Sequence, residues 1–222
     1  MLHLNTIASH RHAAGKNSTA DKLLVAAGEL MIERNSIDVS LSDIAHKAGV
    51  NAALVKYHFG NKDGLLLALL ERDAAAEMVT LDTLMAQPMS ATQKMRLHIA
   101  GIIRTYYQFP YMNRLIHYLL HENGNEAANE VSKFFVGPLL DFHRRLLAEG
   151  VATGEFRPVD PVLFYTSLIG ACDHLFFGRH TMARAIGIGP VTDQVCRDYI
   201  QHMENLILHG ILTSSAPSTA PA

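Results

Sequence analysis

Two histidines in the C-terminal half have a spacing that could bind a metal ion. His117 and His121 are four residues apart, so on a helix both imidazoles can reach one ion. Asp173 and His174 could complete such a site. Because the chain has 13 histidines, this spacing is weakly specific. We therefore expect no metal and no other cofactor, and keep a metal-responsive protein as an alternative.

Asp173 and His174 could also act as an acid and base pair in an enzyme. The familiar catalytic motifs are missing, however. The chain has no G-x-S-x-G, no phosphate-binding glycine loop and no Cys-x-x-Cys, and GIG at 187–189 lacks a third glycine and a preceding strand. We expect a protein that is not an enzyme, and catalysis in the C-terminal half remains an alternative.

Aromatic and polar side chains gather in the region between residues 91 and 184. Core packing explains any single Phe there, but a buried polar group without a partner costs about 1–3 kcal/mol, so several together favour water or a ligand. The set predicts a cavity for a small, largely apolar effector, neutral or weakly acidic, with an acceptor end. The expected lining residues are Phe109, His117, Phe135, Phe142, Asp173, His174 and Phe177.

The elements that must position these groups all show helical patterns, and no stretch alternates like a β-strand. Ser90 and Gln93 form a capping box at one helix start, and a bend is expected at Gly137-Pro138. The fold class expected is all-α. The helices predicted beyond residue 61 cover 62–85, 91–108, 111–122, 126–149, 161–184 and 191–212.

The segment SLSDIAHKAGVNAALVKYHFGNK at 40–62 has the pattern of two short helices joined by a glycine turn. Ser40 and Asp43 form a capping box, and Gly49 stands where a tight turn needs a residue without Cβ. Asn51 can cap the second helix, and its Val55 and Phe59 should be core residues. This is the helix-turn-helix plan, in which the second helix enters the DNA major groove.

With its flanking helices, this segment resembles the N-terminal domain of TetR-type transcriptional regulators over residues 18–73. The family pattern is A-A-x-E-L-F, then S/T-L-x-D-I-A-x-x-A-G-V, then Y-x-H/Y-F-x-x-K-x-x-L. The matching residues are Ala26, Ala27, Glu29, Leu30, Met31, Ser40, Leu41, Asp43, Ile44, Ala45, Ala48, Gly49, Val50, Tyr57, His58, Phe59, Lys62 and Leu65.

The chain also departs from the family pattern. Asn35 and Ser36 replace the usual glycine and aromatic residue after the first helix, and Asn tolerates the left-handed turn that glycine would supply. Asn51-Ala52-Ala53 replaces the common start of the recognition helix, and Lys56 replaces a common Tyr. The scaffold is therefore typical, but the surface that would read bases is particular to this chain.

The resemblance implies which residues contact DNA. Positions 51–54 and 56 would approach bases, where Lys56 could donate to a guanine edge. Tyr57, His58 and Lys62 would approach phosphates. The DNA-binding residues expected are Ser40, Ser42, Asn51, Ala52, Ala53, Leu54, Lys56, Tyr57, His58 and Lys62. A helix-turn-helix surface used only for protein contacts is a further alternative.

The resemblance also implies three helices for DNA and six for a ligand-binding and dimerisation bundle. The expected organisation is a flexible arm at 1–17, the DNA-binding domain at 18–61, the effector and dimerisation domain at 62–212 and a disordered tail at 213–222. The arm contains Arg11 and Lys16 and no acid, so it could contact phosphates or the minor groove. An untethered terminus is the simpler interpretation of the arm.

Composition agrees with a cytoplasmic protein. No apolar run is long enough to span a bilayer, and residues 1–20 lack a signal-peptide core. Cys172 and Cys196 are too few for a disulfide scaffold. The net charge of −2 is unusual for a nucleic-acid binder, but through Arg72 eight Lys/Arg outnumber seven Asp/Glu.

Small and apolar residues on the last two helices suggest self-association, although these stripes could instead face the subunit's own core; the family resemblance implies a homodimer. Ser167, Gly170, Ala171 and His174 form one line, and a stripe on the last helix comprises Val195, Tyr199, Met203, Leu206 and Gly210. The resemblance implies a ligand-responsive regulator, a repressor released by its effector from an operator of double-stranded DNA that is an inverted repeat. The sequence does not exclude activation.

Overall fold

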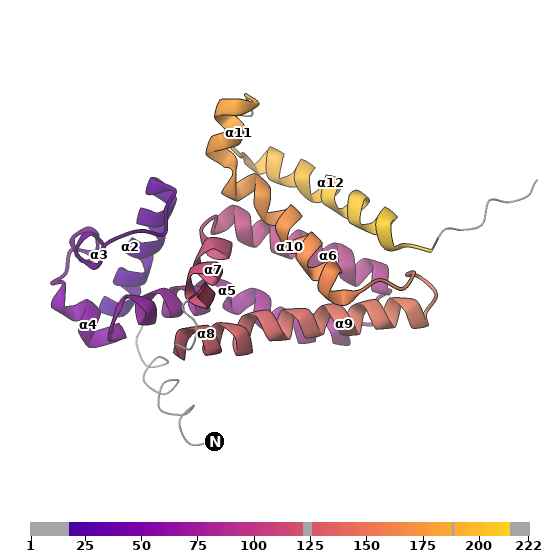
Figure 1. Ribbon diagram of the computed structural model, residues 1–222, viewed down its shortest axis with the longest axis horizontal. Helices are drawn as coiled ribbons and strands as arrows, with labels where there is room; N and C mark the ends of the chain where they lie inside the picture. The colour runs from indigo at the N-terminus through magenta and orange to yellow at the C-terminus, as the bar shows by residue number, and fades with distance from the viewer. Residues whose placement is uncertain (1–17, 122–125, 188, 214–222) are drawn as a thin grey trace, which may run out of the picture. The chain divides into compact units, whose positions relative to one another are not determined.

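The computed structural model describes residues 18–121, 126–187 and 189–213. These residues are almost entirely helical and have no β-strand, which confirms the all-α fold class (Figure 1). The chain divides into two compact units, Met1–Arg72 and Asp73–Ala222. The division falls inside one helix, whereas the sequence placed it between residues 61 and 62. The arm at 1–17 lies outside the described residues.

The first unit contains α2 (Thr19–Arg34), α3 (Leu41–Ala48), α4 (Ala53–Phe59) and the start of α5 (Lys62–Ala86). Helix α2 packs against both α3 and α4. Their inward faces form a small apolar core whose fully buried members include Leu23, Ala27, Met31, Val39, Ile44 and Val55. Val55 therefore lies in the core as expected, but Phe59 is only half-buried.

Local capping sets the ends of these helices. Ser18 Oγ accepts from the amide of Asp21, and Ser40 Oγ accepts from the amide of Asp43. The capping box predicted for Ser40 is only half formed, because the Asp43 carboxylate accepts from Arg34 Nη1 at 2.7 Å instead. Asn35 adopts the left-handed conformation (φ 47°) expected of it.

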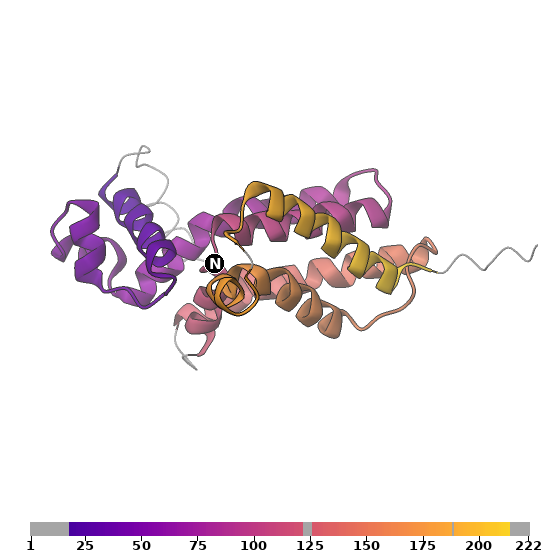
Figure 2. The same cartoon turned by 90° about the horizontal axis from the view of Figure 1, so that it is seen from above.

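The second unit contains the remainder of α5 and the helices that follow it, with α6, α9, α10 and α12 as its main packed layers. Helix α12 lies along α6 in both views (Figures 1 and 2). The capping box of Ser90 and Gln93 is fully formed at the start of α6. The bounds are α6 Ala91–Gln108, α7 Met112–His121, α8 Glu126–Val131, η1 Ser132–Val136, α9 Gly137–Ala152, α10 Pro161–Phe177, α11 Arg179–Ala185 and α12 Asp193–Ile211.

Two helices predicted as continuous are interrupted. The helix expected over 126–149 contains a π-helical turn, η1, in which the Gly137 amide bonds to Ser132 O. Pro138 has no N–H to continue the α-helical pattern, so the wider turn forms just before it. The helix expected over 161–184 ends at Phe177, and Gly178 separates α10 from α11.

The C-terminal end of α12 is tied to the loop after α9. Phe156 and Leu212 form an isolated antiparallel bridge, and Arg157 Nε donates to Gly210 O. Thr213 was predicted to begin a disordered tail, but its amide donates to Glu155 O at 3.0 Å. Residues 214–222 lie outside the described part of the chain.

Candidate functional sites

The turn between α3 and α4 places the second helix of the motif on the surface. Gly49 adopts φ 68°, a left-handed conformation that is strained for most residues with a Cβ. Asn51 Oδ1 accepts from the Ala53 amide at 2.8 Å, but the N-cap position of α4 is held by Ala52 rather than by Asn51, the residue expected there. Val55 is completely buried and anchors the helix from its inner side.

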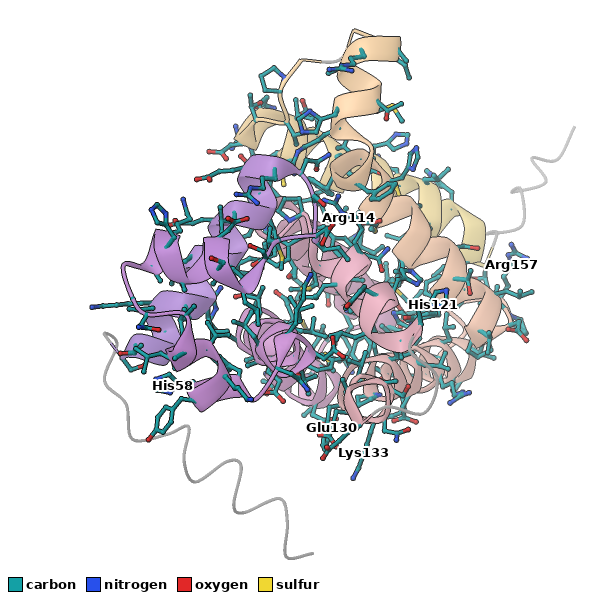
Figure 3. The ribbon with its side chains drawn as sticks, turned by 60° about the vertical axis from the view of Figure 1, so that its left-hand side comes forward. His58, Arg114, His121, Glu130, Lys133 and Arg157 are labelled. Carbon is teal, nitrogen blue, oxygen red and sulfur yellow. The ribbon has the colours of Figure 1, made fainter. Side chains whose placement is uncertain are left out.

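The outer side of α4 faces solvent along its length. Tyr57 is 81% exposed, and its ring meets the neighbouring ring of His58 edge to face at 5.0 Å. Figure 3 shows His58 at the outer edge of this unit. Leu54 and Lys62 are half-buried, whereas the exposed members of the predicted DNA-binding set are Ser40, Ser42, Asn51, Ala52, Ala53, Lys56, Tyr57 and His58.

Internal ion pairs occupy most of the neighbouring cations. Lys47 pairs with Glu33 at 2.8 Å, and this hydrogen bond raises the pKa of Lys47. Arg34 pairs with Asp43 and lowers the pKa of that carboxyl. Lys62, proposed to contact phosphate, lies 3.4 Å from the exposed Asp38 carboxylate.

Lys56 differs from these cations. Within the described residues it forms no ion pair, and it is exposed on the outer side of α4. Lys56 therefore offers an ammonium group, unpaired within the described part of the chain, on the helix that the sequence predicts to enter the groove.

The second unit contains a cavity between α5, α6, α7, η1, α9 and α10. Its volume is about 660 Å³, counting the space at its mouth that is open to solvent. The apolar lining includes Met78, Leu81, Ile102, Ile116, Phe135 and Ile169. The polar and titratable residues of the lining are Glu77, His98, Thr105, Tyr106, Asn113 and Tyr165.

Behind the cavity wall, two histidines form a buried pair. Nε2 of His98 lies 2.7 Å from Nε2 of His143, and His143 is completely buried. Burial lowers the pKa of His143 from an ordinary 6.5 to about 4. Burial, and then the neighbouring His143, lower the pKa of His98 well below 6.5. Both imidazoles are therefore neutral at pH 7.

The hydrogen bond between the two imidazoles favours one arrangement of protons. Nδ1 of His143 is buried without a hydrogen-bond partner among the described residues. An unpaired acceptor is tolerated better than an unpaired N–H, so His143 donates from Nε2 to Nε2 of His98. His98, which lines the cavity, then carries its own proton on Nδ1.

Comparison with known families assigns both units. Residues 88–217 match the family described as "Tetracyclin repressor-like, C-terminal domain", which is more than half of the chain. Residues 23–69 match "Bacterial regulatory proteins, tetR family". The chain belongs to the TetR family. It is a DNA-binding transcriptional regulator, and the resemblance noted from the sequence is confirmed.

Two named regulators are similar to this TetR chain over different lengths. The transcriptional regulator BetI of Brucella anthropi is 45% identical over 49 residues, which are 22% of this chain and 25% of BetI. The chain therefore matches only a quarter of the length of that relative. The transcriptional repressor NicS of Pseudomonas putida is 22% identical over 197 residues, which cover 87% of this chain and 92% of NicS.

A solved TetR-like structure shows the same fold. The regulator FadR of Bacillus subtilis, in complex with stearoyl-CoA, aligns with a TM-score of 0.65 at 18% identity. The alignment covers 85% of this chain and 97% of FadR. Among the described residues, no helix is long and apolar enough to cross a membrane.

The cavity of this TetR chain differs from the one expected from sequence. Of the predicted lining residues only Phe135 reaches it. Placing His117, His174 and Phe177 there was wrong, because all three are exposed on α7 and α10. Arg114 lies over the Phe177 ring, 5.3 Å from its centroid.

The other three predicted residues lie near the cavity without lining it. Phe142 is buried and packs against the ring of His98, with centroids 4.5 Å apart. Asp173 is buried and accepts from Asn113 Nδ2, at 2.9 Å, so it supports a lining residue. Phe109 is half-buried beside Tyr111.

The alternative roles weighed for these side chains gain no support. His121 is exposed at the end of α7 (Figure 3), and His117 is exposed too. No group of three or more His, Cys, Asp or Glu in the described part of the chain could hold a metal ion. Asp173 is buried with Asn113 as its partner, whereas His174 faces solvent, so the two do not form an acid and base pair.

Sequence reasoning missed the polar residues that do line the cavity. Glu77, His98, Tyr106 and Tyr165 stand on three different helices, and no short motif joins them. One signal was present in Gly101, a glycine in the interior of α6. Glycine there costs about 1 kcal/mol relative to alanine and so calls for a packing reason.

Proposed function

We propose that this TetR-family chain is a homodimeric repressor that binds an inverted-repeat operator and is released from it by a small effector. Helix α4 of each subunit would lie in the major groove of one half-site. The observation that carries the proposal is the outer face of α4, with Lys56, Tyr57 and His58 exposed and Val55 anchoring the other side. The similarity to the repressor NicS supports repression over activation.

An exposed apolar face on α10 supports dimerisation. Leu163 is 68% exposed and Phe177 is 47% exposed. Gly170, between them on the helix, is exposed and has no atom within 4 Å of the place a Cβ would take. A second copy of α10 could therefore approach the backbone closely at this point.

The stripe predicted on α12 is divided between two roles. Met203 is buried within its own subunit, whereas Leu206 is 57% exposed. Tyr199 is half-buried, and its hydroxyl donates to Ala171 O on α10. We propose the exposed side of α12 and the exposed side of α10 as the dimer surface.

The effector would act through α5. This helix runs without interruption from Lys62 to Ala86, and its Ala74, Met78 and Leu81 line the cavity. A ligand shifts the equilibrium between two positions of α5 only as far as its affinities for these two conformations differ. The apolar cavity supports an organic effector, as does the stearoyl-CoA bound to FadR, a protein of the same fold.

The test is a selection of DNA fragments from a bacterial genome by the full chain at low salt. We expect enrichment of an inverted repeat whose half-sites lie about one helical turn apart, roughly 10 base pairs centre to centre. A selection that enriches no common sequence would contradict the proposal.

A further inference from the structure

One lining residue of the cavity is a carboxylic acid without a partner in the described part of the chain. Within the described residues, the carboxylate of Glu77 on α5 makes no ion pair and no hydrogen bond. By contrast, Asp82 on the same helix pairs with Arg145 at 2.8 Å. Glu77 is half-buried at the edge of an apolar wall, where a ligand cation could pair with its carboxylate more strongly than in water.

The structure makes room for this carboxylate. A Cβ added to Gly101 on α6 would lie 2.7 Å from Oε2 of Glu77. The glycine therefore lets the Glu77 carboxylate lie against the backbone of α6. Glycine inside a helix lowers helix stability relative to alanine. The space that Gly101 leaves for the Glu77 carboxylate gives a reason for a glycine at this position.

The remaining lining can accept a cation but holds no positive charge that would pair with an anion. No Lys or Arg is among the lining residues in the described part of the chain, and Glu77 is the single carboxylate among them. Phe135, Tyr106 and Tyr165 add aromatic rings, whose faces attract cations. His98 supplies no positive charge, because burial keeps its pKa well below 6.5 and its Nε2 is bonded to His143.

We infer that the cavity takes an apolar molecule with one positive charge, an amphipathic amine or quaternary ammonium ion, whose charge pairs with the carboxylate of Glu77. This inference rests on the proposed effector site and replaces the neutral or weakly acidic ligand expected from sequence. An acyl carboxylate or a phosphate would meet Glu77 with a like charge and no counter-charge in the wall.

Three probes of equal chain length test the charge preference: octylammonium, 1-octanol and octanoate. Their binding to the full chain is measured by calorimetry at pH 7. At this pH an alkylamine is protonated, as a lysine side chain is. We expect octylammonium to bind at least about tenfold more tightly than 1-octanol, which corresponds to about 1.4 kcal/mol. Octanoate should bind more weakly than either.

Three variants locate the effect. Glu77→Gln should reduce octylammonium affinity to about that of 1-octanol and improve octanoate binding. Gly101→Ala should weaken octylammonium selectively, since the new Cβ displaces the carboxylate. Asp82→Asn removes one negative charge from the same helix outside the cavity lining and should leave all three affinities unchanged.

The inference is overturned if octanoate binds as tightly as octylammonium, if Glu77→Gln leaves octylammonium affinity unchanged, or if none of the probes binds. Operator binding is measured separately, without any probe. If the probe results contradict the inference while operator binding is intact, the DNA-binding proposal still stands. If the probes bind as expected but the chain selects no DNA sequence, only the DNA-binding proposal is contradicted.

Discussion

In the first unit the side chains proposed to act, Lys56, Tyr57 and His58, project from α4 into solvent. In the second unit the corresponding groups, Glu77 and His98, line a cavity, and His98 is only 5% exposed. An exposed side chain can change with little effect on stability. A change to a buried side chain also alters the packing around it and the burial of polar groups, and so affects stability. The two surfaces should therefore respond differently to mutation.

The largest effect on folding is expected from a closely packed glycine of the second unit. A Cβ at Gly150 would lie 2.0 Å from Cδ2 of the buried Phe156 ring. Gly150→Ala should lower the free energy of unfolding by about 3 kcal/mol, because the ring cannot move away without opening the core. Urea unfolding followed by circular dichroism measures this.

Gly170→Ala is the matched control, since its Cβ would meet no atom within 4 Å. Within a single subunit, apart from any effect on the proposed contact with a second α10, it should stabilise α10 by about 0.5–1 kcal/mol. Equal stability of the two alanine variants would show that the second unit is not as tightly packed around Gly150 as described.

Gly170→Arg separates assembly from folding. The open space at Gly170 should let a single subunit fold with the arginine, while a close contact with a second α10 is lost. We expect monomers in sedimentation at micromolar concentration and a loss of operator affinity of about a hundredfold, or about 2.7 kcal/mol. A wild-type chain that is already monomeric, or a variant that stays dimeric, would place the interface elsewhere.

Acid should weaken the second unit through its buried histidines. The folded pKa of His143 is about 4, against an ordinary value of 6.5. Between these values the unfolded chain binds a proton that the folded chain does not, so stability falls as the pH drops from 7 to 5. The fall expected from His143 is roughly 1–2 kcal/mol.

His143→Leu checks this assignment. The variant should show a shallower dependence of unfolding free energy on pH over the same range, whatever its stability at pH 7. An unchanged slope would assign the acid sensitivity to other groups.

The sequence predicted the first unit in more detail than the second, for a physical reason. Its signals act over a few residues: Ser40 caps α3, Asn35 adopts the left-handed turn, and Gly49 connects α3 to α4. Such local hydrogen bonds and backbone preferences do not depend on the rest of the fold.

The cavity depends on which face of each helix turns inward, and that is decided by packing between segments far apart in the chain. His117 and His174 are exposed, while His98 meets His143 across 45 residues of sequence. The breaks at Gly178 and before Pro138 also rotate the faces that a continuous helix would present. Composition indicated a cavity in this region but not its walls.

The most direct test of the account is the base preference of α4. The genomic selection is repeated with Lys56→Ala and with Lys62→Ala, whose unfolding free energies should both stay within about 0.5 kcal/mol of wild type. We predict that Lys56→Ala relaxes the preference at one position in each half-site, with affinity falling about tenfold. Lys62→Ala should weaken binding to all DNA sequences equally. An unchanged preference in Lys56→Ala, or a uniform loss like that of Lys62→Ala, would contradict the reading of bases by α4.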